Sequence, residues 1–125
     1  MRVIILVGLL LVASMAVAQD DPYHPVISLP DIEFNVQDVI GVLSDYNVIS
    51  EDNPTFCSQY YGLTDFQSRT ISICARMGQS LKKRTLIHEV LHVLYWQRGI
   101  QTSGSADLAV QVKATEIFMK LYGEK

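Results

Sequence analysis

The chain lacks a surplus of basic residues, and this absence narrows the classes of partner. Its 125 residues contain 10 Lys and Arg against 13 Asp and Glu, which gives a formal net charge of −3. A protein that binds a phosphate backbone needs a basic surface. We therefore expect no nucleic-acid partner. The sequence also has no internal repeat and no low-complexity segment, and its length is typical of a single domain.

Long apolar runs are absent except at the N-terminus. There, Arg2 precedes the apolar run Val3–Val12, and Ala16-Val17-Ala18 is followed by the polar residues Gln19-Asp20-Asp21. A positive start, an apolar stretch and a small-x-small site are the three parts of a secretory signal peptide. The run is shorter than the roughly 20 apolar residues of a membrane-spanning helix. We expect residues 1–18 to be removed, leaving an exported chain, periplasmic or secreted, with no membrane attachment.

Cysteine is scarce, and neither Cys57 nor Cys74 lies near the expected cleavage point, which argues against a lipid-anchored mature end. In an oxidising compartment the two are expected to form a disulfide. The aromatic and β-branched segments Phe56–Tyr61 and Arg69–Cys74 predict two strands joined through Leu63–Gln67. A hairpin folded symmetrically about that connection places the two cysteines on facing positions, where Cβ atoms lie about 4.5–5.5 Å apart. The alternative is a pair of buried free thiols.

The rest of the chain shows mainly helical periodicity. Residues 19–34 are polar and punctuated by proline, which predicts an extended entry segment. Apolar residues recur at helical spacing over 36–46, over 81–98 and over 106–122, and the middle segment is apolar on most sides, as in a buried central helix. The expected N-cap residues of these helices are Asn35, Ser80 and Ser105. The predicted fold class is α+β, with one domain over 35–125.

One motif carries chemistry. His88-Glu89-Val90-Leu91-His92 matches H-E-x-x-H and falls inside the predicted central helix. Residues four apart lie one turn above one another on the same helical face, so two imidazoles can converge on one ion, and zinc suits them. Glu89 follows the first ligand and can activate a metal-bound water instead of binding the metal. The motif predicts a Zn²⁺ site with His88 and His92 as ligands and Glu89 as the catalytic residue. The alternative is a structural histidine pair on a buried helix.

A catalytic zinc site needs a third protein ligand, and no third histidine follows His92. The remaining histidine, His24, lies in the proline-rich entry segment. Asp107 falls on the apolar stripe of the last predicted helix, near its start, whereas Glu116 falls on the more polar side. The third ligand is therefore expected to be Asp107, with Glu116 as the alternative. Asp107 could instead be a first-turn carboxylate that interacts with the helix dipole.

Residues 62–122, about half of the chain, resemble the minimal gluzincin-type zinc metallopeptidases of bacteria and phages, the broad group that includes ImmA/IrrE-like peptidases. The resemblance is carried by an "rtIxI" strand, a "TLxHExxHxL" helix and a last helix that opens with an acid: these are Arg69–Ile73, Thr85–Leu94, and Asp107 with Val110, Ala114, Ile117 and Phe118. It implies a zincin-like α+β fold. The family places Glu at the third ligand position, where this chain has Asp107.

The resemblance also implies how a substrate would bind. The strand formed by Arg69, Thr70, Ile71, Ser72 and Ile73 would be an edge strand that pairs with an extended peptide. The resulting hypothesis is an exported zinc metallopeptidase that hydrolyses peptide bonds through a metal-activated water. The alternatives are a catalytically weak zinc-binding interaction or inhibitory module with the same fold, and a small exported interaction protein without metal.

Overall fold

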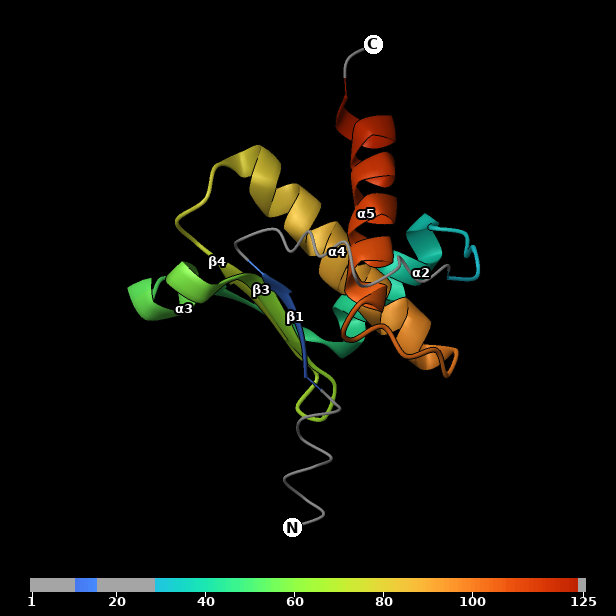
Figure 1. Cartoon of the computed structure of the whole chain (residues 1–125), viewed down its shortest axis with the longest axis horizontal. Helices are drawn as coiled ribbons and strands as arrows, with labels where there is room; N and C mark the ends of the chain where they lie inside the picture. The colour runs from blue at the N-terminus through green and yellow to red at the C-terminus, as the bar shows by residue number, and fades with distance from the viewer. Residues whose placement is uncertain (1–10, 16–28, 124–125) are drawn as a thin grey trace.

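The computed structural model of the protein describes residues 11–15 and 29–123, and it has the predicted α+β class. Figure 1 shows a small sheet with helices packed on one of its faces. The strands are β1 (Leu11–Met15), β2 (Asn47–Glu51), β3 (Tyr60–Asp65) and β4 (Thr70–Cys74). The helices within the described residues are α2 (Val36–Asp45), α3 (Pro54–Gln59), α4 (Gln79–Gln97) and α5 (Ala106–Tyr122). None of these helices combines the length and apolar character needed to cross a membrane.

The sheet is mixed, with the strand order β1-β3-β4-β2. The β1/β3 and β3/β4 pairs are antiparallel, whereas β2 runs parallel to β4. Strand β1 belongs to the segment predicted as a signal peptide, and the rest of residues 1–18 lies outside the described residues. Of the predicted extended segment 19–34, residues 29–34 are described and have no regular secondary structure.

One prediction about the strands is wrong, and one strand was missed. The segment Arg69–Ile73 is not an edge strand, because β4 pairs with β3 on one side and with β2 on the other. The sequence analysis predicted no strand over Asn47–Glu51, but this segment is β2 and forms a parallel pair with β4 in which Val48 faces Ile71. That pairing joins residues far apart in the chain, and a local pattern does not reveal it. Strand β4 is therefore an inner strand, between β3 and β2.

The disulfide is present, but the reasoning that predicted it used the wrong local structure. Cys57 and Cys74 are bonded across a sequence separation of 17. Cys57 lies on helix α3 and not on a strand, and the hairpin pairs Gly62 with Ile73 and Leu63 with Ser72, so its register differs from the predicted one. Asn53 caps α3 by accepting a hydrogen bond from the Thr55 amide at 2.8 Å. The disulfide therefore fixes a short helix to the end of β4.

The predicted helices are confirmed with small differences at their starts. Asn35 caps α2 through a 2.9 Å hydrogen bond from the Asp38 amide, as its sequence pattern indicated. Helix α4 begins at Gln79 after Gly78, so Ser80 lies inside it, and Ser105 precedes α5 without a side-chain capping bond. All residues from Ile87 to Tyr95 are buried, which confirms that α4 is the central helix.

Helix α4 packs against the sheet on one side and against α5 and α2 on the other (Figure 1). Alternation along the strands turns Ile71 and Ile73 of β4 into the core, together with Gly62 and Thr64 of β3. On α4 the core continues through apolar residues that include Val90, Leu91 and Leu94. The H-E-x-x-H segment consequently lies between the sheet and α5, and both layers can contribute to its surroundings.

Loss of the disulfide is expected to lower the free energy of unfolding by about 3 kcal/mol, since a closed loop of this length removes that much chain entropy from the unfolded state. The measurement is urea unfolding of the wild type and of a Cys57→Ser/Cys74→Ser double variant. A difference below about 0.5 kcal/mol, the range of an ordinary surface substitution, would contradict a stapling role.

Candidate metal centre

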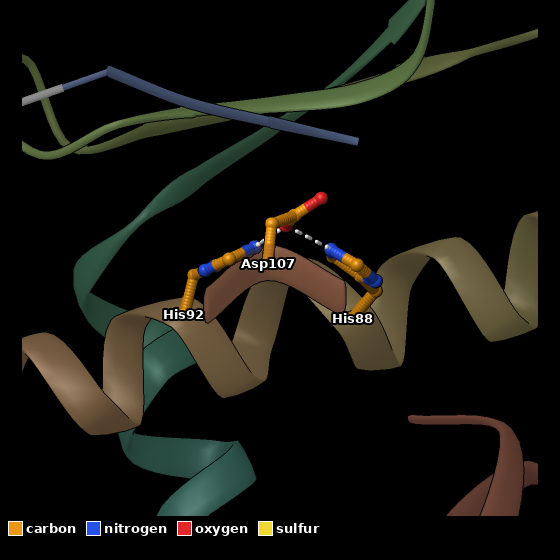
Figure 2. A group of neighbouring side chains, drawn as sticks. All are labelled: His88, His92 and Asp107. Carbon is orange, nitrogen blue, oxygen red and sulfur yellow. Dashed lines mark hydrogen bonds and ion pairs between the residues drawn. The ribbon is translucent and has the colours of Figure 1, made fainter. Parts of the chain in front are cut away.

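Helix α4 places His88 and His92 on one face. Their ring centroids are 4.7 Å apart and their planes are inclined by 59°, and the side chains are 2% and 0% exposed. Four residues is about one helical turn, so the two rings lie one above the other. In Figure 2 the two rings converge on Asp107, the residue of α5 that their Nε2 atoms contact. The motif thus forms a pair of buried imidazoles whose nitrogens face the same neighbouring helix.

The end of α4 determines where α5 begins. Gly99 has a φ of +75°, a left-handed conformation that glycine adopts readily. The Gly99 amide donates to the Trp96 carbonyl and the Ile100 amide donates to the Tyr95 carbonyl, which together form a Schellman motif. The chain then reverses through a short loop that contains Thr102 and enters α5 at Ala106. This reversal brings the first turn of α5, with Asp107, beside the motif face of α4.

One carboxylate oxygen of Asp107 lies between the two histidines. Its Oδ1 is 2.9 Å from Nε2 of His88 and 2.7 Å from Nε2 of His92, as the dashed lines in Figure 2 show. The ligand atoms of these three residues all lie within 4.8 Å of one another. Asp107 is 25% exposed, in contrast to the two buried rings. The cluster is therefore closed on the α4 side and more open at the carboxylate.

The electrostatics of the cluster favour an ionised Asp107. Burial raises the pKa of its carboxyl, but the hydrogen bonds to His88 and His92 and the charges of these residues outweigh burial and lower the pKa to about 2. Burial likewise lowers the pKa of His88, but the hydrogen bond to Asp107 and the charges of Glu89 and Asp107 raise the net value above the ordinary 6.5. The carboxylate and the imidazolium stabilise each other.

The donor set fits a zinc ion. Two imidazole nitrogens and one carboxylate oxygen are the ligands of one known class of catalytic zinc site, which keeps a further position open. At metal–ligand distances of about 2.0–2.2 Å, tetrahedral ligand atoms lie roughly 3.3 Å apart. The Nε2 atoms of His88 and His92 are 2.9 and 2.7 Å from Asp107 Oδ1, and all three ligand atoms lie within 4.8 Å of one another, a spacing close to that of a zinc ligand set.

A threonine outside the group of His88, His92 and Asp107 forms a hydrogen bond with His92. Thr102, which is 3% exposed, places its Oγ1 2.7 Å from Nδ1 of His92. A bond of this kind fixes the orientation of the ring and determines which nitrogen faces the ion. The sequence analysis did not single out Thr102, and neither its spacing from the motif nor its loop position gives a signal that could have done so.

Strand β3 contributes a second set of contacts that the sequence analysis missed. Thr64 Oγ1 donates a 2.6 Å hydrogen bond to Oε1 of Glu89, and both residues are 0% exposed. Gly62 lies two residues earlier on the same face, where a Cβ atom would approach Thr85 Cγ2 to 2.8 Å and Glu89 Oε2 to 3.1 Å. A glycine inside a strand often marks such a close approach, and this was the one available signal.

The other candidates lie away from the cluster. Glu116 is exposed on α5 and is not a member of the metal-ligand group found within the described residues. His24 lies outside the described residues. Of the two acids considered as third ligand, Asp107 is the one that the fold places beside both histidines.

Comparison of the chain with protein-family models, with curated proteins and with solved structures finds no match. The resemblance to gluzincin-type peptidases therefore rests on the motif residues and stays a prediction.

The zinc content of variants tests whether Asp107 is the third ligand. We expect about one zinc per chain in the wild type and loss of tight retention in Asp107→Ala, because two histidines alone leave the ion without its third protein ligand. Glu116→Ala is the matched control on the same helix and should retain the metal. Elemental analysis of the purified proteins measures all three. Full zinc content in Asp107→Ala would exclude Asp107 as a ligand.

Zinc affinity should also depend on pH in a defined direction. A zinc ligand must be deprotonated, and the raised pKa of His88 lets protons compete with zinc up to a higher pH than an ordinary histidine allows. Asp107, with a pKa of about 2, stays ionised above about pH 4 and adds little to this dependence. Competition titrations with a chelating dye should show affinity still rising as the pH passes 6.5. A plateau already reached below pH 6.5 would contradict the stabilised imidazolium.

Proposed function

We propose that this protein is an exported zinc-dependent metallopeptidase. The observation that carries the proposal is the convergence of His88, His92 and Asp107, whose ligand atoms lie within 4.8 Å of one another around the H-E-x-x-H helix. Export agrees with the signal-peptide pattern of residues 1–18 and with the Cys57–Cys74 disulfide, since disulfides persist mainly in oxidising compartments.

In peptide hydrolysis the zinc ion and the side chains would have separate roles. Zinc held by the three ligands would supply a Lewis acid that polarises a peptide carbonyl and acidifies water. Glu89 is the proton carrier: its carboxylate accepts a proton from the attacking water and passes it to the nitrogen of the leaving amine. Thr64 holds Oε1 of that carboxylate at 2.6 Å. Asp107 would complete the ligand set with the two histidines, and Thr102 keeps the His92 ring oriented.

An extended peptide is the substrate class that the sheet favours. Strand β1 pairs antiparallel with β3 from Leu11 opposite Asp65 to Met15 opposite Tyr60, and it contacts α4. Figure 2 shows this strand crossing above the three side chains. An extended segment can therefore lie along β3 beside the motif helix. If residues 1–18 are removed, the freed edge of β3 can pair with a peptide in the same direction. This replaces the β4 edge expected from the sequence.

One observation favours the second candidate, a zinc-binding interaction module with weak turnover. His88, Glu89 and His92 are at most 2% exposed, so the reacting groups are covered in this structure. A protein that used zinc for stability alone would need no access to Glu89. The two candidates therefore differ in what Glu89 does.

Replacement of Glu89 by Gln separates the two. In a metallopeptidase, Glu89→Gln should lower the rate of peptide cleavage by at least about 100-fold, because it removes the general base, while zinc content stays near that of the wild type. The assay uses a mixture of unstructured peptides with mass-spectrometric detection, on the full chain and on a chain that begins at Gln19. Glu116→Gln, an exposed change on α5, is the matched control.

Each outcome decides between the candidates. Cleavage by the wild type and by Glu116→Gln, but not by Glu89→Gln, supports the peptidase. Zinc-loaded wild type that leaves every peptide intact in both chain lengths would support the interaction module instead.

A further inference from the structure

The contact between Thr64 and Glu89 joins the sheet to the motif helix at the reacting group. Thr64 lies on β3 and Glu89 lies on α4, 25 positions further along the chain, and the donor–acceptor distance is 2.6 Å. Neither side chain is exposed. Burial of a carboxylate is costly unless it is hydrogen-bonded, so this contact has to be made well for the helix and the sheet to pack as they do.

Strand β3 contacts the two carboxylate oxygens of Glu89 in different ways. Thr64 donates to Oε1, and Gly62 leaves room for Oε2, which lies 3.1 Å from the position that a Cβ atom would occupy. Positions 62 and 64 face α4 together because side chains alternate along a strand. The pair therefore forms a seat, which we call the β3 seat: a hydroxyl that holds one oxygen and a bare backbone that accommodates the other.

The β3 seat is rigid, and rigidity suits a residue that has to hold a proton carrier in one orientation. Thr64 faces Ile71 across the β3/β4 ladder, and its β-branched side chain has a restricted χ1, so the hydroxyl is held in place before any substrate arrives. The Thr64 hydroxyl is uncharged and orients the carboxylate through this one short hydrogen bond.

We propose that Thr64 is a positioning residue, which fixes the carboxylate of Glu89 in the one orientation from which it can exchange protons with water and the leaving amine. The proposal rests on the proposed peptidase function. A purely structural hydrogen bond between sheet and helix would affect stability alone, whereas a positioning bond affects turnover at unchanged substrate binding.

Thr102 provides the matched comparison. Both threonines are buried, and the hydroxyl of each forms a hydrogen bond with a side chain of the motif, at 2.6 Å for Thr64 and 2.7 Å for Thr102. Thr102 contacts a metal ligand, whereas Thr64 contacts the proton carrier. The same Thr→Val change, which keeps the shape and removes the hydroxyl, should therefore have different consequences at the two positions.

The experiment compares the wild type with Thr64→Val, Thr64→Ser and Thr102→Val in the zinc-loaded full protein. For Thr64→Val we expect kcat to fall about 10- to 100-fold with KM and zinc affinity within about twofold of the wild type, which is the signature of an interaction made in the transition state. Thr64→Ser should regain most of the lost kcat. Thr102→Val should instead weaken zinc affinity by about 10- to 100-fold, a loss that Thr64→Val should not show.

A crystal structure of Thr64→Val supplies a readout that does not depend on activity. The Glu89 carboxylate should leave the β3 seat in this variant and keep it in Thr64→Ser. An unchanged Glu89 rotamer in Thr64→Val, or an unchanged kcat, overturns the positioning role even if the protein is a peptidase. A wild type that binds zinc and cleaves no peptide overturns the proposed function, and with it the catalytic meaning of Thr64, while the rotamer comparison still decides whether Thr64 orients Glu89.

Discussion

Burial of the polar face of α4 is the constraint to which the other elements conform. His88, Glu89 and His92 lie on a helix whose residues from 87 to 95 are all buried, and buried polar groups need hydrogen-bond partners. The partners come from three different parts of the chain: Asp107 from α5, Thr102 from the loop before it, and Thr64 from β3. Each contact fixes one neighbouring element relative to α4. The apolar core provides most of the driving force for packing, and these few bonds join α4 to each of its neighbours at defined atoms.

Two glycines make the close approach of these layers sterically feasible. Gly99 ends α4 in a left-handed conformation, so that the chain can reverse within a short loop and deliver α5 next to the histidines. Gly62 lets β3 approach α4 until backbone and carboxylate are nearly in contact. A side chain at either position would act on the polar cluster indirectly, at Gly99 by altering the reversal and at Gly62 by displacing Thr85 or Glu89.

The elements that the sequence predicts well are those with strong local signals. The start of α2 follows from its capping residue Asn35, and the buried helix around the motif and α5 follow from the spacing of their apolar residues. The segment around Cys57 was misread, because its aromatic and β-branched residues favour a strand while Asn53 and Pro54 start a helix. The pairing of β2 with β4 and the contacts of Thr64 and Thr102 join residues without any periodic relation, so local patterns contain no information about them.

The aspartate at position 107 departs from the glutamate of the resembling family, and the geometry gives a reason why the shorter acid suffices. Aspartate reaches one methylene less, so its helix has to lie closer to the histidines. The Schellman reversal at Gly99 places position 107 in the first turn of α5, where Oδ1 meets both Nε2 atoms at 2.9 and 2.7 Å. The same bonds to His88 and His92 lower the pKa of this carboxyl against the opposing effect of burial. A glutamate at the same position would have to fold back to place its oxygen between the rings. The length of the side chain and the closeness of the helix are thus matched to each other.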